Sequence, residues 1–214
     1  MEFKKSLQEQ LGEHEPNQVD ELILDELFKN VETFTPEHKK TLELYENLEH
    51  LSLNAFGLKS LKNFPKLPNL RVLEIRENKL SGSDLGDLKT LYPGLYKLKV
   101  GENPIASLDS FKVLASFPNL KKLELRDCDV TKKDTYRDEL FKMLKNVDII
   151  DKMNRQGEEI DSTIYDEDDD EFGDMEEGEE VDDDFEEDED DFEDEEDEEE
   201  EEEARPAGKK QHRE

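Results

Sequence analysis

Apolar residues recur along residues 19–130 in the pattern L-x-x-L-x-L-x-x-N/C-x-L, and this repeat constrains the fold more than any other feature. Its copies begin at Val19, Leu48, Leu70, Leu95 and Leu120, so the intervals are 29, 22, 25 and 25 residues. The two central apolar positions of each copy lie two residues apart, which is the period of a strand rather than of a helix. The first copy is degenerate and has Leu27 in the Asn slot.

This pattern predicts an α/β leucine-rich-repeat solenoid: a curved domain with short parallel strands on its concave face. The paired leucines should point inward and stack into a continuous core. Asn78 and Asn103 stand where the chain leaves the strand, so their amides should satisfy backbone groups that have lost a ladder partner. Cys128 takes the same slot and should be a buried packing residue rather than a reactive thiol.

A solenoid must also seal its two ends. Near the N-terminus, Phe3, Leu7 and Leu11 recur at helical spacing, which predicts a capping helix that Gly12 ends. Near residue 140 a second amphipathic segment predicts a C-terminal capping helix, followed by a strand-like stretch at 147–150. The predicted repeat domain therefore spans 1–157, with an N-terminal cap at 1–18, repeats at about 19–132 and a C-terminal cap at about 133–157.

Charge is concentrated after this domain rather than spread along the chain. The chain has 62 acidic and 29 basic residues, for a net charge of -33. Residues 1–157 hold 27 acidic and 25 basic residues, whereas residues 158–203 hold 34 acidic residues and no Lys or Arg. The few apolar residues of 158–203 are too sparse to offset the entropy of ordering, so we predict a disordered acidic tail there. Residues 204–214 form a short basic C-terminus.

Composition also narrows the classes of partner and location. A single cysteine excludes an intramolecular disulfide and favours a reducing compartment. The sequence shows no secretory signal and no run of 18 apolar residues, so we expect no membrane association. The large negative charge disfavours direct nucleic-acid partners and favours basic proteins. A capped solenoid of this kind is expected to be a monomer.

Catalysis is not expected. The four histidines are scattered without the spacing of metal ligands, and neither a phosphate-binding loop nor a nucleophile elbow occurs. The tail carboxylates are not preorganised to coordinate an ion. We therefore predict no catalytic residue, no metal site and no cofactor.

The repeats, the terminal cap Tyr136-Arg137-x-x-Leu140-Phe141-x-x-Leu144 and the acidic tail together resemble the acidic leucine-rich nuclear phosphoproteins over nearly the whole chain. The cap alone is also similar to that of a spliceosomal ribonucleoprotein subunit. The chain departs from the family pattern at two places. It has Leu144-Lys145-Asn146 where the family usually has Leu-Pro, and Ile150-Asp151-Lys152 where the family usually has Leu-Asp-Gly. The resemblance implies nuclear location with shuttling to the cytoplasm, histone binding and inhibition of histone acetylation. For some members it implies inhibition of a type-2A protein phosphatase, and roles in apoptosis or nucleocytoplasmic transport.

The tail is the first candidate site, as a polyanion for core histones or histone dimers. Its charge would attract basic histones from beyond one Debye length, about 8 Å at physiological salt, and would replace DNA phosphates. Aromatic side chains that follow acidic pairs would anchor the interface. The alternative is a solubilising run in which these aromatic residues are incidental. The predicted histone-binding residues are Asp170, Glu171, Phe172, Asp183, Asp184, Phe185, Asp190, Asp191 and Phe192.

The concave face is the second candidate site. Side chains that flank the inward leucines should face solvent there, and the basic ones are Arg76, Lys97, Lys99, Lys122 and Arg126. Three interpretations stay open: an ordinary solvated face, a partner-binding face or a docking surface for the tail. We predict a nuclear histone chaperone or acetylation blocker that acts through its tail, and the alternative is a phosphatase inhibitor or signalling adaptor that acts through this face. Thr163 is a phosphorylation candidate and 205–213 a candidate nuclear-import signal.

Overall fold

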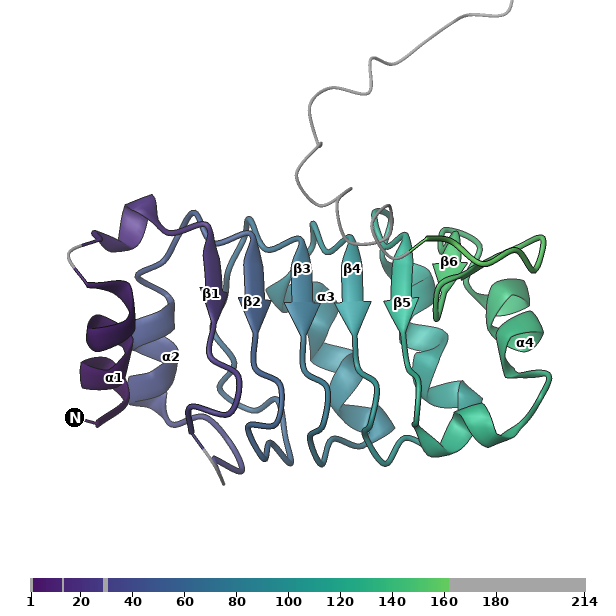
Figure 1. Ribbon diagram of the computed structural model, residues 1–214, viewed down its shortest axis with the longest axis horizontal. Coiled ribbons are helices and arrows are strands. Elements are labelled where there is room, and N and C mark those ends of the chain that lie inside the picture. Colours follow the sequence, from purple (N-terminus) through teal and green to yellow (C-terminus); the bar gives the residue numbers. More distant parts are fainter. Residues whose placement is uncertain (1, 13, 29–30, 162–214) are drawn as a thin grey trace, which may run out of the picture. The chain divides into compact units, whose positions relative to one another are not determined.

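A computed structural model of the chain describes residues 2–12, 14–28 and 31–161. Short strands in this part form one sheet whose spatial order follows the sequence (Figure 1). The strands are β1 (Glu21–Ile23), β2 (His50–Ser52), β3 (Val72–Glu74), β4 (Lys97–Lys99), β5 (Lys122–Glu124), β6 (Ile149–Ile150) and β7 (Met153–Asn154). Pairing is parallel from β1 to β6, and only β7 runs antiparallel to its neighbour. The predicted leucine-rich-repeat solenoid is confirmed.

The register between strands follows the repeat. Each central leucine is the Cα partner of the central leucine in the next copy, as in Leu51, Leu73 and Leu98. These three side chains are fully buried. Because every copy places the same residue type at the same height, burial continues from one repeat to the next, which gives the domain one long core.

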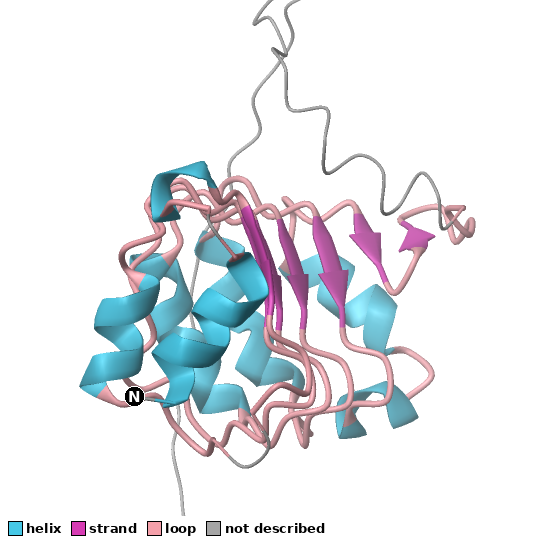
Figure 2. Ribbon diagram, turned by 60° about the vertical axis from the view of Figure 1, so that its left-hand side comes forward, coloured by secondary structure: helices cyan, strands magenta, loops and turns pink. Residues whose placement is uncertain are grey.

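Helical segments cover one side of the sheet and leave its other side open (Figure 2). The α-helices are α1 (Glu2–Leu11), α2 (Pro36–Leu42), α3 (Leu88–Leu91) and α4 (Tyr136–Met143). Short 3₁₀-helices are η1 (Pro16–Gln18), η2 (Gly82–Asp87), η3 (Leu108–Ser116) and η4 (Asp129–Lys132). Helix α2 is not among the predicted elements, and it lies in the 29-residue interval between the first two copies. Thr35 caps this helix by accepting a hydrogen bond from the backbone N–H of His38 at 3.2 Å.

Asn78 and Asn103 hydrogen-bond to backbone groups where the chain leaves a strand, as predicted. The Asn103 amide donates to the carbonyls of Ile75, Val100 and Gly101 at 2.9, 2.9 and 3.1 Å. Its oxygen accepts the N–H of Leu80 at 3.0 Å, so one side chain ties two repeats together. Asn78 makes the equivalent contacts one repeat earlier.

Cys128 occupies the same slot as a packing residue, as predicted. Its side chain is 1% exposed, and its Sγ donates to the Val100 carbonyl at 3.3 Å. Burial raises the pKa of this thiol to about 11, so it stays protonated at neutral pH.

Leu27 differs from the other slot residues, because it is 44% exposed. The slot is buried by contacts with the preceding repeat, as the hydrogen bonds of Asn78 to Leu53 and Gly57 show. The first copy has no repeat before it, so a side chain in its slot remains in solvent.

Both predicted caps are present. Phe3 and Leu7 of α1 are buried, and α1 ends at Leu11. Gly12 follows it with a φ of 62°, which lies in the left-handed region that glycine favours. At the other end, α4 is followed by β6 and then by a hairpin that the sequence reading did not predict. This hairpin continues past residue 157, because the Ile160 N–H donates to the Lys152 carbonyl at 2.7 Å.

Buried polar contacts hold the C-terminal cap to the last repeat. The Asp151 carboxylate accepts the Tyr136 hydroxyl at 2.6 Å and the Leu125 N–H at 2.7 Å. The Arg155 guanidinium donates to four carbonyls at and beyond the end of α4, at 2.6–3.0 Å. The Arg155 donors thus satisfy the Phe141 carbonyl in the last turn of α4 and three carbonyls that follow the helix.

Candidate binding face

The open side of the sheet carries the side chains that flank the buried leucines of β1 to β5, and we call it the strand face. All five predicted basic residues belong to the copies of β3 to β5, and Lys97 and Lys122 occupy the same position in successive copies. Since parallel strands are about 4.8 Å apart, side chains at one height are within reach of their neighbours. The repeat therefore brings together residues of different copies that are 20 or more positions apart in the sequence, as Asn54 and Glu74 are.

Glu74 of β3 is the centre of a network of charges on this face. One carboxylate oxygen is 2.9 Å from Lys99 Nζ and 3.2 Å from His50 Nε2, and the other is 3.0 Å from the Arg76 guanidinium. The Glu74 side chain is 9% exposed, so these contacts replace water that the carboxylate has lost. Two of the predicted basic residues are thus structural partners of a buried carboxylate.

Glu124 of β5 is a second buried carboxylate on the strand face that pairs with cations. It lies 3.5 Å from the guanidinium groups of both Arg76 and Arg126. Its side chain is 5% exposed, whereas that of Arg76 is 32% and that of Arg126 is 50% exposed. On β3 to β5 the carboxylates of Glu74 and Glu124 therefore lie deeper than the guanidinium groups of Arg76 and Arg126, which are nearer to solvent.

The N-terminal part of the strand face is acidic. Asp25 accepts hydrogen bonds from the Ser52 hydroxyl at 2.6 Å and from the Asn54 backbone N–H at 2.8 Å. Glu21 lies 2.8 Å from His50 Nδ1. Neither acid is among the residues predicted for the concave face. Their offset from Leu22 and Leu24 in the degenerate first copy is the signal that could have found them.

The expectation that the basic side chains of the concave face point into solvent is wrong for Lys97 and Lys122, which are 0% and 1% exposed. The two lysines are Cα partners, so each stem is flanked by the other. Lys122 Nζ also lies 5.7 Å from the centre of the Tyr96 ring. In-register packing shields long side chains that a strand taken alone would expose.

Ion pairs on this face shift the pKa values of two groups, Glu74 and His50. Burial alone would raise the pKa of Glu74, but the His50 hydrogen bond and the charges of Lys99 and Arg76 hold it well below its usual range. Burial alone would lower the pKa of His50, but Glu74 and Glu21 outweigh it and raise the pKa above 6.5.

We expect His50 to make stability depend on pH. Because its folded pKa is raised, its contribution is complete below the unfolded pKa and is lost as pH rises through the folded pKa. His50→Gln should therefore lower the free energy of unfolding most between about pH 5 and pH 6, and progressively less at higher pH. Guanidinium denaturation of the wild type and of the His50→Gln variant, between about pH 5 and pH 6 and at higher pH, measures the difference in the free energy of unfolding. A constant difference at every pH would contradict the assignment.

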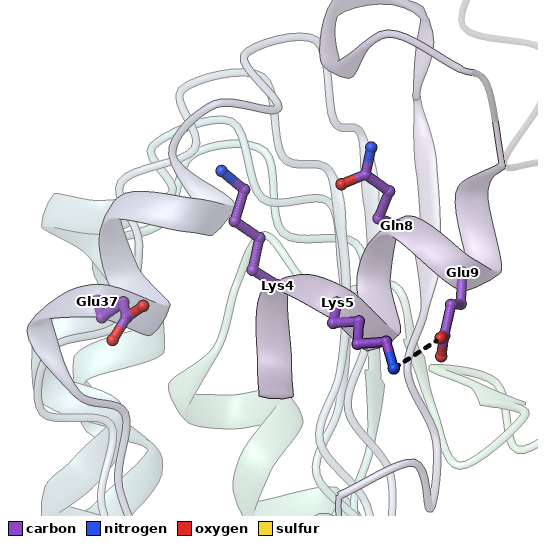
Figure 3. A pocket seen from close by; sticks show the side chains of 5 residues that line it. All are labelled: Lys4, Lys5, Gln8, Glu9 and Glu37. Carbon is purple, nitrogen blue, oxygen red and sulfur yellow. Dashed lines mark ion pairs between the residues drawn. The ribbon is translucent and has the colours of Figure 1, made fainter. Parts of the chain in front are cut away.

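A hollow of about 380 Å³ lies beside α1, lined by the side chains that Figure 3 labels: Lys4, Lys5, Gln8, Glu9 and Glu37. Lys5 and Glu9 form an ion pair of 3.5 Å across one helical turn, with both side chains more than half exposed. Such an exposed pair contributes little energy. Nothing in this hollow matches a residue that the sequence reading singled out.

The tail candidates, which are the nine histone-binding residues, Thr163 and residues 205–213, lie outside the described residues. Within residues 2–12, 14–28 and 31–161, no three His, Cys, Asp or Glu side chains are grouped as metal ligands would be. No helix in those same ranges has the length and apolar character needed to cross a membrane.

The amino-acid sequence matches a family model and is similar to several curated proteins. The leucine-rich repeat family model matches residues 40–165. An acidic leucine-rich nuclear phosphoprotein 32-related protein of Plasmodium falciparum is 34% identical over 152 residues, which cover 70% of this chain and 53% of the relative. The acidic leucine-rich nuclear phosphoprotein 32 family member A of Drosophila melanogaster is 36% identical over 118 residues, 55% of this chain and 44% of the relative. The chain thus spans about half the length of the curated relatives it matches.

Among solved structures, a chain of the Drosophila melanogaster SNF/U2A′ complex superposes with a TM-score of 0.51. It is 22% identical, and the match covers 67% of this chain and 75% of that chain. At this identity the likeness shows the fold alone.

Proposed function

The chain belongs to the leucine-rich-repeat family as a member of the acidic leucine-rich nuclear phosphoproteins, and we propose that it is a nuclear, non-enzymatic regulator that binds histones through its acidic tail. One observation carries the proposal: 34 acidic residues and no basic ones occupy 158–203, next to a nearly neutral repeat domain. A polyanion of this density attracts strongly basic proteins over long range. Bound to a histone, it would block DNA contacts and shield the lysines that acetylation targets.

The arrangement of the repeat domain supports this division of labour. Its strand face holds its own carboxylates in ion pairs with Arg76, Lys99 and His50, so those acids are not available to a basic ligand. Excess negative charge is confined to the residues after the domain. The tail is therefore the proposed effector, and the repeat domain is the proposed adaptor that fixes where the tail acts.

Removal of residues 162–214 should weaken binding to purified histone dimers by at least about 100-fold, which corresponds to about 2.8 kcal/mol. The full chain with both Phe185→Ala and Phe192→Ala keeps its net charge, and it should bind more weakly than the wild type at physiological salt because it lacks two aromatic anchors. Titration calorimetry across a salt series measures both effects. Circular dichroism of the truncated chain is the control for folding of the repeat domain.

Two outcomes would count against this assignment. Tight binding by a folded chain that lacks 162–214 would move the site to the repeat domain. Binding by the full chain that fades to nothing with salt, with no effect of the two phenylalanine substitutions, would leave only nonspecific attraction.

A second proposal is a signalling adaptor that inhibits a type-2A protein phosphatase through the strand face. The outward guanidinium groups of Arg76 and Arg126 favour it, because they are placed to meet an acidic partner surface. The same truncated chain discriminates between the two proposals. Phosphatase inhibition should survive truncation if the strand face carries it.

A further inference from the structure

The first copy of the repeat differs from the later ones at the strand-face position that follows the central buried leucine. Ile23 occupies this position in β1, and its Cα partner in β2 is Ser52. The next copies continue the row with Glu74, Lys99 and Glu124. The Ile23 side chain is 44% exposed. An apolar side chain therefore faces solvent at a position that is polar in the four later copies.

Leu27 adds a second exposed apolar side chain to the same copy. It is also 44% exposed, whereas the residues in the same slot of the four later copies are all buried. Single exposed apolar residues are common on protein surfaces and need no explanation. Here two of them belong to the one copy that no repeat precedes, so neither is covered from that side.

The sequence around β1 is acidic. Residues 6–28 contain seven acidic residues and no Lys or Arg. Asp20 and Glu21 are exposed where β1 begins, and the Glu21 side chain remains 55% exposed although it pairs with His50. The carboxylate of Glu74, in contrast, is 9% exposed and is enclosed by cations. A surface of this charge repels a second copy of itself and attracts basic groups.

The edge of the sheet indicates how a partner would bind there. β1 is the first strand of the sheet (Figure 1). The Leu24 N–H donates to the Ser52 carbonyl of β2, and backbone groups alternate in direction along a strand, so those of Ile23 point to the outer edge. The Gln10 amide of α1 donates to the Ile23 carbonyl. Because α1 takes up this edge group, we expect a partner to contact side chains rather than to add a strand.

We propose that Asp20, Glu21, Ile23 and Leu27, which we call the first-copy surface, bind a basic segment of a partner protein. In this segment an aliphatic side chain lies between lysines or arginines. The carboxylates pair with the basic groups, and Ile23 and Leu27 contact the aliphatic side chain. The contact does not depend on the tail. It would let the repeat domain discriminate among basic partners, all of which the tail attracts by charge.

A pair of peptides tests the proposal on the full chain. The isotope-labelled protein is titrated with a lysine-rich peptide that has leucine at its centre, and separately with a matched peptide that has serine there. The tail attracts both peptides alike, because their charges are equal. NMR signals of the backbone amides of residues 20–27 report binding to the first-copy surface. The leucine peptide should give a dissociation constant about fivefold lower than the serine peptide, because part of its leucine is buried.

Matched variants test which residues are responsible. The full chain with both Ile23→Ser and Leu27→Ser keeps its net charge and should lose the preference for the leucine peptide. Leu44→Ser is the control, because Leu44 is 55% exposed but follows α2 rather than β1, and this variant should keep the preference. Asp20→Asn combined with Glu21→Gln should weaken the binding of both peptides at residues 20–27.

Three results would overturn the proposal. The first is an equal dissociation constant for the two peptides on the wild type. The second is loss of the preference in Leu44→Ser to the same extent as in the variant of Ile23 and Leu27. The third is movement of the signals of residues 20–27 when residues 204–214 are deleted and no peptide is present, which would mean that the chain's own basic C-terminus occupies this surface. None of these results bears on histone binding by the tail, which removal of residues 162–214 tests.

Discussion

Asn103→Ala is expected to lower the free energy of unfolding of the repeat domain by about 3–5 kcal/mol. The side chain is 2% exposed and makes four hydrogen bonds to backbone groups. Alanine would leave the Leu80 N–H and three carbonyls without this partner in a place closed to water. Each buried group left unpaired costs about 1–3 kcal/mol, and local relaxation recovers part of the total.

A loss of this size is a large share of the 5–15 kcal/mol that typically stabilises a domain. Chemical denaturation monitored by circular dichroism measures it. Asn69→Ala is the matched control, because Asn69 is exposed and donates one hydrogen bond, to the Glu46 carbonyl at 3.0 Å. The control should cost no more than about 1 kcal/mol. Equal losses in the two variants would mean that Asn103 does not join the repeats as described.

Glu74→Ala is expected to destabilise the domain by a similar amount, about 3–5 kcal/mol, which is the usual cost of removing one partner of a buried ion pair. His50, Lys99 and Arg76 would all lose their shared carboxylate. The pKa of His50 should also fall, because its largest favourable contribution comes from the Glu74 hydrogen bond.

Two measurements separate this network from a general packing effect. Denaturation gives the stability, and an NMR titration of the His50 ring gives its pKa. Glu46→Ala, at an exposed position, is the control and should change neither. A large loss of stability with an unchanged His50 pKa would mean that Glu74 acts by packing alone and that the charge network is not formed in solution.

The roles of Asn103 and Glu74 differ in how far they could be predicted from the sequence. Asn103 could be assigned from the sequence because its contacts lie within one repeat and its immediate neighbour. The role of Glu74 could not be assigned from the sequence, because its partners His50, Arg76 and Lys99 belong to three different copies of the repeat. Charged residues are also common along the chain, so none of these residues stands out. Arg76 and Glu124 are 48 positions apart, and only the stacking of β3, β4 and β5 brings them together.

The proposed functions rest on different parts of the chain. Histone binding is assigned to residues beyond 161, from charge density and family membership, and it stays a prediction. The strand face of β3 to β5 is described in detail, and its buried carboxylates and outward guanidinium groups support the second proposal, a signalling adaptor. The experiments above address these two parts separately.

The amino-acid sequence was enough to predict the repeat interval, the parallel strands, the asparagine slots, both caps and the separation of charge from the domain. These features depend on local periodicity and composition, which a linear pattern contains. Three features could be seen only in the folded domain: the burial of Lys97 and Lys122, the extension of the strand face by Glu21 and Asp25, and the cations that pair with Glu74 and Glu124. Burial and ion pairing depend on distances of a few ångströms between side chains of different repeats. Those distances are set by strand register and by the packing of the whole core.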